Sequence, residues 1–225
     1  MAALHQTPPE VAKVARELTD LSDRVERWTV ALDYALAAHR GVLTAVAVER
    51  IVKPAVETML ADAGSEIAGA GFVSAAGLVS GNTDFMAWWQ GPDIERVDAL
   101  ANLSTSPEAR YRDADWYRNP VESGRLTVTG PYVDLLCTDS FALTYTAPVG
   151  WSRPEGPVGV AGVDVTVSAL ERRLTRTLAA VAGTASLVNA EDRIIVTTSP
   201  LATPGDFAAP PEHRWPLGHG LSVVV

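Results

Sequence analysis

The residues with the clearest chemical potential lie close together in the middle of the chain. They are an adjacent aromatic pair, Trp116 and Tyr117, then Tyr132 and Asp134, and finally Asp164 at the end of a glycine-rich apolar run. Pockets for small polar molecules combine mostly apolar or aromatic walls with a few placed polar groups. Carboxylates that face aromatic rings suit an ammonium group, through charge-assisted hydrogen bonds and cation–π contact. This combination predicts a binding site for a small molecule that carries an amino group.

Structural roles are the alternative for every one of these side chains. Trp116 and Tyr117 are compatible with core aromatics whose polar atoms bond to the backbone. Asp134 is compatible with a turn residue that accepts local backbone N–H bonds. Asp164 is compatible with an N-cap of the helix expected after it, a role that can coexist with ligand binding.

Catalysis is a further alternative, with Asp134 and Asp164 as an acid–base pair and His213 or His219 as an additional base. The sequence contains no G-x-S-x-G, no H-E-x-x-H and no His/Cys spacing typical of a metal site. We therefore expect a protein that is not an enzyme and that needs no metal and no cofactor.

Composition limits the partners that the chain can have. It has 225 residues, a formal net charge of -9 and one cysteine, Cys137. A chain of this length can bury a sizeable core without disulfides, and a single thiol fits a reducing compartment. The acidic balance, without a Lys/Arg cluster, argues against nucleic acid and against an anionic membrane as partners.

Targeting and membrane-spanning segments are not expected. The N-terminus lacks a basic start followed by an uninterrupted apolar run. The most apolar stretch, 28–48, is interrupted by Asp33, His39 and Arg40. We therefore expect a soluble, cytoplasmic protein.

A long helix is predicted at the N-terminus, because prolines followed by an acidic residue at 8–10 are typical of a helix start. Apolar residues then alternate in steps of four and three, at Val14, Leu18, Leu21, Val25, Trp28, Leu32 and Ala35. Such a heptad seam fits a helix–helix contact in a homodimer. One helix laid along its own sheet gives a wider stripe of similar period. We favour the dimer because the stripe is narrow, and we assign residues 1–62 to an N-terminal helical region.

The remainder, 63–225, is predicted to form one ligand-binding domain. Many glycines in the segment 67–79 fit tight turns or close packing of a helix on the sheet. In the strand expected over 85–90, alternation places one of Trp88 and Trp89 in a pocket and the other in the core. Short strands with turns between them are expected over 115–165. The other expected elements are a helix over 41–61, a connection over 91–112, a helix over 165–180, a hairpin over 185–198 and a final strand over 221–225.

Four motifs resemble, in order and spacing, the Cache family of ligand-sensing domains, which are PAS-like modules of bacterial chemoreceptors and sensor kinases. They are W-Y at 116–117, P-Y-x-D at 131–134, T-x-x-x-P-V at 144–149 and G-V-x-G-x-D at 159–164. The resemblance implies an α+β fold, in which a long N-terminal helix packs along a PAS-like central antiparallel β-sheet. It also implies that the aromatic and acidic residues of these motifs line the ligand pocket.

The resemblance also bears on the ligand. In the amino-acid-binding branch of the family, an arginine two residues before the W-Y pair holds the ligand carboxylate, and this chain has Ala114 there. The residues that hold the amino group of the ligand match the tyrosine and the two aspartates named above. The carboxylate clamp is thus lost, or moved to Arg112 or Arg118. We favour an amine, a polyamine or a quaternary amine, with an amino acid or another small metabolite as alternatives.

The predicted function is a ligand-binding sensor domain in a signalling or regulatory role, with a homodimer whose long helix passes on the effect of the ligand. No DNA-binding, kinase or repeat motif is present, so a separate regulatory protein is an expected partner. The alternative is a PAS-like interaction module with a closed pocket, because fold alone does not establish function. The expected ligand-binding residues are Trp88, Arg112, Trp116, Tyr117, Tyr132, Asp134 and Asp164.

Overall fold

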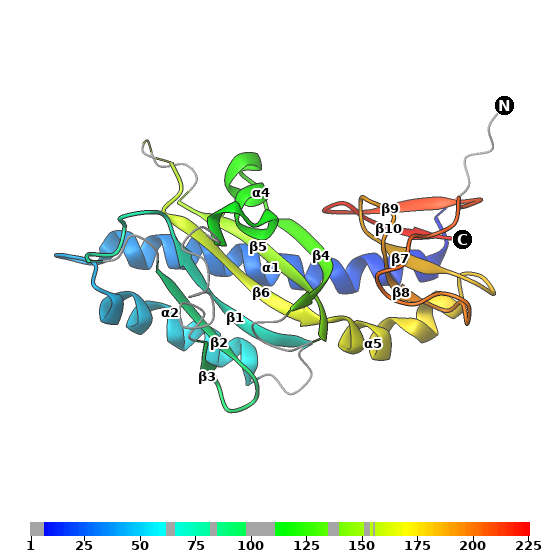
Figure 1. The fold of residues 1–225 in the computed structure, drawn as a ribbon, viewed down its shortest axis with the longest axis horizontal. Coiled ribbons are helices and arrows are strands. Elements are labelled where there is room, and N and C mark those ends of the chain that lie inside the picture. The colour runs from blue at the N-terminus through cyan, green and yellow to red at the C-terminus, as the bar shows by residue number, and fades with distance from the viewer. Residues whose placement is uncertain are drawn as a thin grey trace.

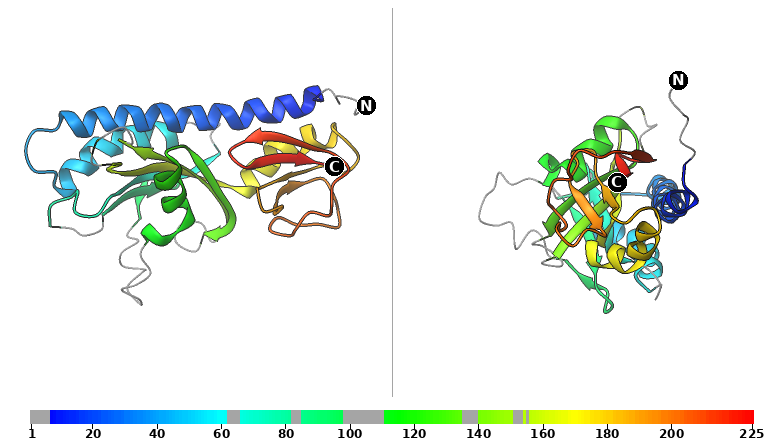
Figure 2. Two further views of the ribbon diagram at one scale, coloured as in Figure 1. Left: turned by 90° about the horizontal axis from the view of Figure 1, so that it is seen from above. Right: turned by 90° about the vertical axis from the view of Figure 1, so that its right-hand side faces the viewer.

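Two antiparallel sheets lie side by side along one long helix (Figures 1 and 2). The computed structural model describes residues 7–61, 66–81, 85–97, 111–134, 140–150, 154 and 156–225. Its helices are α1 (Pro9–Ala38), α2 (Ala45–Leu60), the short 3-10 helix η1 (Tyr111–Asp113), α4 (Asp115–Ser123) and α5 (Val167–Ala179). Its strands are β1 (Ile67–Ser74), β2 (Met86–Gln90), β3 (Glu95–Arg96), β4 (Thr127–Asp134), β5 (Ser140–Val149), β6 (Gly159–Thr166), β7 (Ser186–Val188), β8 (Ile194–Thr197), β9 (Arg214–Gly218) and β10 (Leu221–Val224).

The larger sheet has six strands in the order β3-β2-β1-β6-β5-β4, and the smaller has four in the order β8-β7-β10-β9. All neighbouring strands in both sheets are antiparallel. Helix α5 follows β6 in the chain and packs against β8, so it connects the two sheets. The α+β architecture with a long N-terminal helix is the one that the sequence predicts, although the strands of the predicted domain 63–225 form two sheets.

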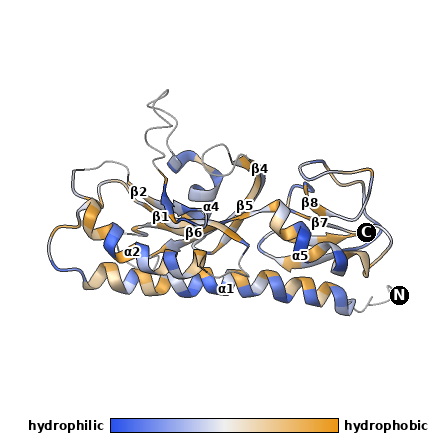
Figure 3. Ribbon diagram, turned by 90° about the horizontal axis from the view of Figure 1, so that it is seen from below, coloured by the Kyte–Doolittle hydropathy of each residue, from blue (hydrophilic) through white to orange (hydrophobic). Residues whose placement is uncertain are grey.

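Helix α1 buries its apolar stripe against its own chain. Val14 and Val25 are fully buried, and Leu18, Trp28 and Leu32 are at most 7% exposed. The helix contacts β5 and β6 of the larger sheet, β9 of the smaller sheet, and α5, while hydrophilic residues alternate with the stripe along its length (Figure 3). Of the two interpretations of the seam, packing within one chain is the one observed, and the seam gives no support to the expected homodimer.

Polar contacts join α1, α5 and the start of the larger sheet. Arg173 of α5 forms ion pairs with Glu17 of α1, at 2.9 Å, and with Glu66 next to β1. Tyr145 of β5 lies nearby in the core, fully buried, and its hydroxyl has no hydrogen-bond partner among the described residues. Burial, and then the negative charge of Glu66, raise the pKa of this hydroxyl above its usual value.

Several elements differ from the sequence-based expectation. Residues 115–123, expected as strand and turn, form helix α4, which ends at Gly124 with a left-handed φ of 68°. The long helical stretch expected over 41–61 begins only at Ala45, where the Thr44 side chain caps the backbone N–H of Ala47. Strand β9 is not among the expected elements. The connection expected over 91–112 contains β3 and η1, and its residues 98–110 lie outside the described part of the chain.

Candidate functional site

The six-stranded sheet has one face covered by long helices and one covered by α4. Helices α1 and α2 pack on the first face, where Phe72, Tyr145 and Val163 belong to the main core. Helix α4 crosses the opposite face, over β4, β5 and β6 (Figure 2). We call this opposite side the α4 face. Because side chains alternate along a strand, the residues between those core positions, Thr144 and Asp164 among them, belong to the α4 face.

Helix α4 is tied to the sheet through its aromatic pair. The Tyr117 hydroxyl donates to the backbone oxygen of Ser74 on β1, at 3.4 Å, and the Thr146 hydroxyl of β5 donates to the backbone oxygen of Trp116, at 2.6 Å. Tyr111 of η1 lies against both aromatic residues, with ring centroids 6.4 Å from Trp116 and 6.1 Å from Tyr117. These three rings form an aromatic roof over the α4 face.

A chain of hydroxyl groups leads from β4 to a buried carboxylate on β6. Asp164 is 5% exposed, and its Oδ1 accepts a hydrogen bond of 2.6 Å from the Thr144 hydroxyl on the neighbouring strand. The Tyr132 hydroxyl bonds to the same Thr144 oxygen. Because the Thr144 proton is directed at Asp164, Tyr132 is the donor in this second bond. The N-cap of α5 is Thr166 and not Asp164, so the capping role considered for Asp164 is excluded.

Tyr132 reaches the α4 face because β4 is irregular. The register between β4 and β5 shifts between Thr129 and Tyr132, so that Tyr132 pairs with Ala142. Gly130, inside this bulge, has a φ of 119°, and a Cβ there would lie 2.5 Å from the backbone oxygen of Ala142. Glycine is therefore required at this position for the strand to approach β5 closely.

The two tryptophans of β2 point to opposite faces, as strand alternation predicts. Trp89 joins the main core beneath the helices, and Trp88, 4% exposed, joins Tyr111 and Tyr117 on the α4 face. The Trp88 ring lies over the glycines of β1. A Cβ on Gly71 would lie 2.6 Å from Trp88 Cε3, and one on Gly69 would lie 2.8 Å from Trp88 Nε1. These glycines therefore make room for an indole ring, and the expected turn or helix packing at this point is wrong.

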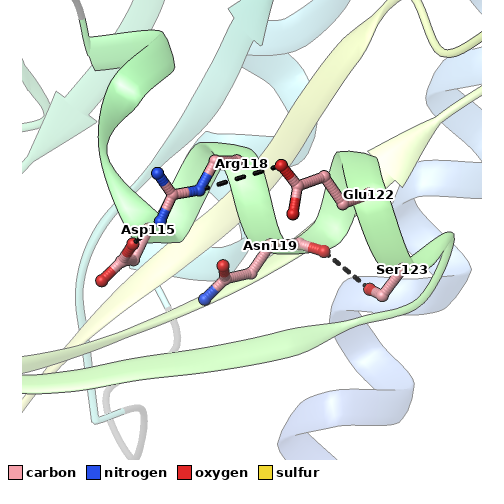
Figure 4. A network of polar contacts seen from close by, with 5 residues as sticks. All are labelled: Asp115, Arg118, Asn119, Glu122 and Ser123. Carbon is pink, nitrogen blue, oxygen red and sulfur yellow. Dashed lines mark hydrogen bonds and ion pairs between the residues drawn. The ribbon is translucent and has the colours of Figure 1, made fainter.

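The two arginines considered as a carboxylate clamp have different surroundings. Arg118 is 51% exposed on the outside of α4, where it forms ion pairs with Asp115 at 2.6 Å and with Glu122 at 3.9 Å (Figure 4). These contacts hold it away from the sheet. Arg112 lies in η1, between Tyr111 and α4, and its Nε is buried. Arg112 therefore stays a candidate for contact with a ligand, and Arg118 does not.

Asp134 is the one predicted site residue whose side chain lies outside the described part of the structure. Its backbone belongs to β4 and pairs with Ser140 of β5. Its predicted role therefore rests on the P-Y-x-D motif. Thr144 and Gly69 belong to the site and were not predicted, although both lie on the same strands as motif residues.

A cleft of about 460 Å³ lies between the α4 face and the smaller sheet. Two hydrogen bonds cross from one sheet to the other: Asn189 Nδ2 donates to the Gly130 oxygen at 2.8 Å, and His219 Nδ1 lies 3.2 Å from the Leu126 oxygen. Both contacts therefore tie turns of the smaller sheet to β4 or to the residue just before it. Its walls come from α4, β4 and the turns of the smaller sheet, and include Asp115, Trp116, Asn119, Thr129, Tyr132, Glu191 and Arg193.

The described residues form neither a metal site nor a membrane-spanning helix. No group of three or more His, Cys, Asp or Glu side chains in this part of the chain is arranged to hold a metal ion. None of its helices is both long and apolar enough to cross a membrane.

Comparison with known proteins identifies the type of fold. Residues 80–172 match the family model for the first PDC sensor domain of methyl-accepting chemotaxis protein-like sequences. No curated protein matches the chain. Among solved structures, the ligand-binding domain of the amino acid chemoreceptor PctC of Pseudomonas aeruginosa, in complex with GABA, is 20% identical with a TM-score of 0.56. The match covers 96% of this chain and 92% of that one.

Two further structures are similar over most of the chain. The sensory domain of the Campylobacter jejuni chemoreceptor Tlp3, with isoleucine bound, is 16% identical with a TM-score of 0.54, covering 97% of this chain and 96% of that one. Methyl-accepting chemotaxis protein X is 18% identical with a TM-score of 0.59, and the match covers 84% of this chain and 70% of that one. Other similar chains are longer, and this chain spans 63 to 67% of them. The chain therefore has the fold of the Cache/PDC ligand-binding domains of chemoreceptors, which the four motifs predicted.

Proposed function

We propose that this chain is a ligand-binding sensor domain for a small metabolite with an amino group, acting in signalling or regulation and not in catalysis. The observation that carries the proposal is the position of Asp164. Its carboxylate is 5% exposed, lies on the α4 face, and is fixed by the Thr144 hydroxyl. An ammonium group that binds such a carboxylate gains a charge-assisted hydrogen bond in surroundings of low dielectric constant.

The direction of the hydroxyl chain adds to this preference. Tyr132 donates its proton to Thr144, and Thr144 donates to Asp164. The Tyr132 oxygen therefore meets a ligand as an acceptor, which again suits N–H donors. The Trp116 ring, which lines the cleft together with Tyr132, offers a π face to a cation there.

The similar solved domains support the same class of ligand. PctC was solved with GABA and Tlp3 with isoleucine, and both of these molecules carry an amino group. The proposed ligand contacts of this chain are Trp88, Arg112, Trp116, Tyr117, Tyr132, Asp134 and Asp164, with Asp134 included for its place in the motif. The cleft beside Trp116 and Tyr132 is the proposed approach for the ligand.

A thermal-shift screen tests the proposal. Purified protein is heated with amino acids, polyamines, choline-type amines and small carboxylates. A ligand at about 100 times its dissociation constant adds about 2.7 kcal/mol to the free energy of unfolding and raises the melting temperature by several degrees. We expect shifts with amines or amino acids, and none with carboxylates that lack an amino group.

The screen is repeated on Asp164→Asn and on a matched control, Glu122→Gln. Glu122 is a carboxylate on the outer side of α4, 67% exposed (Figure 4). The shifts are expected to vanish in Asp164→Asn and to persist in Glu122→Gln. If no amine shifts the wild-type protein, the closed interaction module becomes the better explanation of the fold.

A further inference from the structure

Trp88 has a buried polar atom that the packing of the α4 face does not satisfy. The residue is 4% exposed, and its Nε1 has no hydrogen-bond partner among the described residues. An indole N–H that is buried without a partner costs about 1–3 kcal/mol of stability. Such orphaned donors in a native fold are uncommon and call for an explanation, and one explanation is a ligand atom that is absent from the protein alone.

The surroundings of Gly69 show which polar group lies near this donor. A Cβ built on Gly69 would lie 2.8 Å from Trp88 Nε1 and 3.3 Å from Asp164 Oδ2. Gly69 pairs with Asp164 across β1 and β6. One point above Gly69 is therefore within contact distance of both an N–H donor and a carboxylate oxygen. A side chain on Gly69 would meet both groups, so glycine is needed here for the indole N–H and the carboxylate to lie this close to β1.

From this arrangement we infer that Trp88 is a specificity-determining residue, whose indole N–H binds an oxygen acceptor of the ligand next to the amino group held by Asp164. The inference rests on the proposed function, and it narrows the ligand to amines that carry a hydroxyl or carboxylate oxygen on a neighbouring carbon. Plain alkylamines satisfy only Asp164. Quaternary amines have no N–H to offer this carboxylate.

The recognition depends on the glycines of β1. The indole ring lies over Gly69 and Gly71, and this brings its Nε1 from β2 across β1 towards Asp164 on β6. A methyl group on Gly69 would push the ring away, since 2.8 Å is closer than a carbon and a nitrogen normally approach.

Three amines with the same carbon skeleton test the inference on the full chain: sec-butylamine, 2-amino-1-butanol and 2-aminobutanoate. They differ only in whether the carbon beside the amino carbon is a methyl group, a hydroxymethyl group or a carboxylate. Isothermal titration calorimetry is expected to show tighter binding of the two oxygen-bearing amines to the wild-type protein. Trp88→Phe keeps a ring and removes the N–H, so it is expected to reduce this preference roughly tenfold while sec-butylamine is unaffected. Comparing the hydroxyl with the carboxylate shows which oxygen the site prefers.

The matched control is Trp89→Phe, which removes an indole N–H from the opposite face of the same strand and should leave the preference unchanged. Nuclear magnetic resonance gives a second readout. It compares the three amines on the wild-type protein, so it does not depend on whether a variant folds. Among the six tryptophans of the chain, the Trp88 indole N–H signal should move downfield with 2-amino-1-butanol or 2-aminobutanoate and not with sec-butylamine.

The outcomes separate this inference from the proposed function. Equal wild-type affinity for all three amines, or an unchanged preference in Trp88→Phe, overturns the role of Trp88 and leaves the amine sensor standing. Binding of none of the three, together with a screen in which no amine shifts the melting temperature, overturns both.

Discussion

Thr144 and Asp164 face each other across β5 and β6, and the Thr144 hydroxyl donates a hydrogen bond of 2.6 Å to Oδ1 of Asp164. This bond fixes the carboxylate that we propose as the anchor for the ligand. It also fixes the direction of the bond from Tyr132, so that one threonine sets the hydrogen-bonding character of the whole site.

Replacement of Thr144 by valine should therefore weaken both the fold and ligand binding. The buried carboxylate loses a donor, and the free energy of unfolding is expected to fall by about 1–3 kcal/mol. Affinity for an amine should fall as well, because Asp164 and Tyr132 are no longer held in place. Urea unfolding and calorimetric titration measure the two effects. Thr144→Ser keeps the hydroxyl and should restore most of both, and a valine variant with unchanged affinity would refute the role of this bond.

The stripe of α1 should behave as part of the core. Leu18 is 5% exposed, and Leu18→Ala is expected to lower the free energy of unfolding by about 2–4 kcal/mol. Tyr34 lies on the outer side of the helix and is 73% exposed. Tyr34→Ser should change the free energy of unfolding by less than about 0.5 kcal/mol. Urea unfolding at two protein concentrations, with light scattering, distinguishes packing of the stripe within one chain from a contact between two chains. A Leu18→Ala variant of unchanged stability that has lost a dimer would support the seam as a contact between chains.

Tyr145→Phe should be neutral or slightly stabilising at neutral pH. The variant removes a hydroxyl that is buried without a partner among the described residues, so no hydrogen bond is lost. Burial raises the pKa of this hydroxyl in the folded state. As the pH rises past about 10, the ordinary pKa of a tyrosine, the unfolded chain therefore loses this proton before the folded protein does. Wild-type stability should then fall with increasing pH more steeply than that of the variant, by up to about 1.4 kcal/mol per pH unit. Urea unfolding at pH 8 and pH 10.5 checks this, and equal slopes would contradict it.

Arg173→Gln should lower the free energy of unfolding only slightly. The guanidinium joins Glu17 and Glu66, but its side chain is 39% exposed and the pairs are partly screened by solvent. A loss of less than about 1 kcal/mol is expected, smaller still at 1 M salt because screening has already weakened the pairs. Chemical unfolding at low and high salt measures it. A loss above about 3 kcal/mol at both salt concentrations would show that these ion pairs behave as buried ones.

Much of the fold follows from local sequence patterns. The antiparallel sheet is implied by the resemblance of the four motifs to the Cache family. The proline-led start and the apolar stripe predict the long helix, and the alternation in β2 separates Trp88 from Trp89. The hairpin predicted over 185–198 is also observed, and Asp192 in its turn has a left-handed φ of 63°. Such features depend on residues close together in the chain, so the sequence alone is enough to predict them.

Features that depend on distant contacts were harder to predict. A stripe repeating every 3.5 residues and one repeating every 3.6 differ little over one helix, and the difference appears only at the end, where Ala35 is exposed and Leu36 is buried. Helix α4 carries Pro120 inside it, which conceals a helix in the sequence. The need for glycine at position 69 could not be predicted, because it depends on the contact with Trp88 of the neighbouring strand.

The most direct test of the central claim is calorimetric titration of the best amine from the thermal-shift screen onto wild-type protein and onto Asp164→Asn. The variant keeps the shape of the side chain and an oxygen that can accept from Thr144, and it removes the negative charge. We expect one site in the wild-type protein and an affinity lower by roughly 100-fold in the variant, as is typical when one partner of a buried charged pair is removed. An unchanged affinity in Asp164→Asn would contradict the claim that this carboxylate binds the amino group.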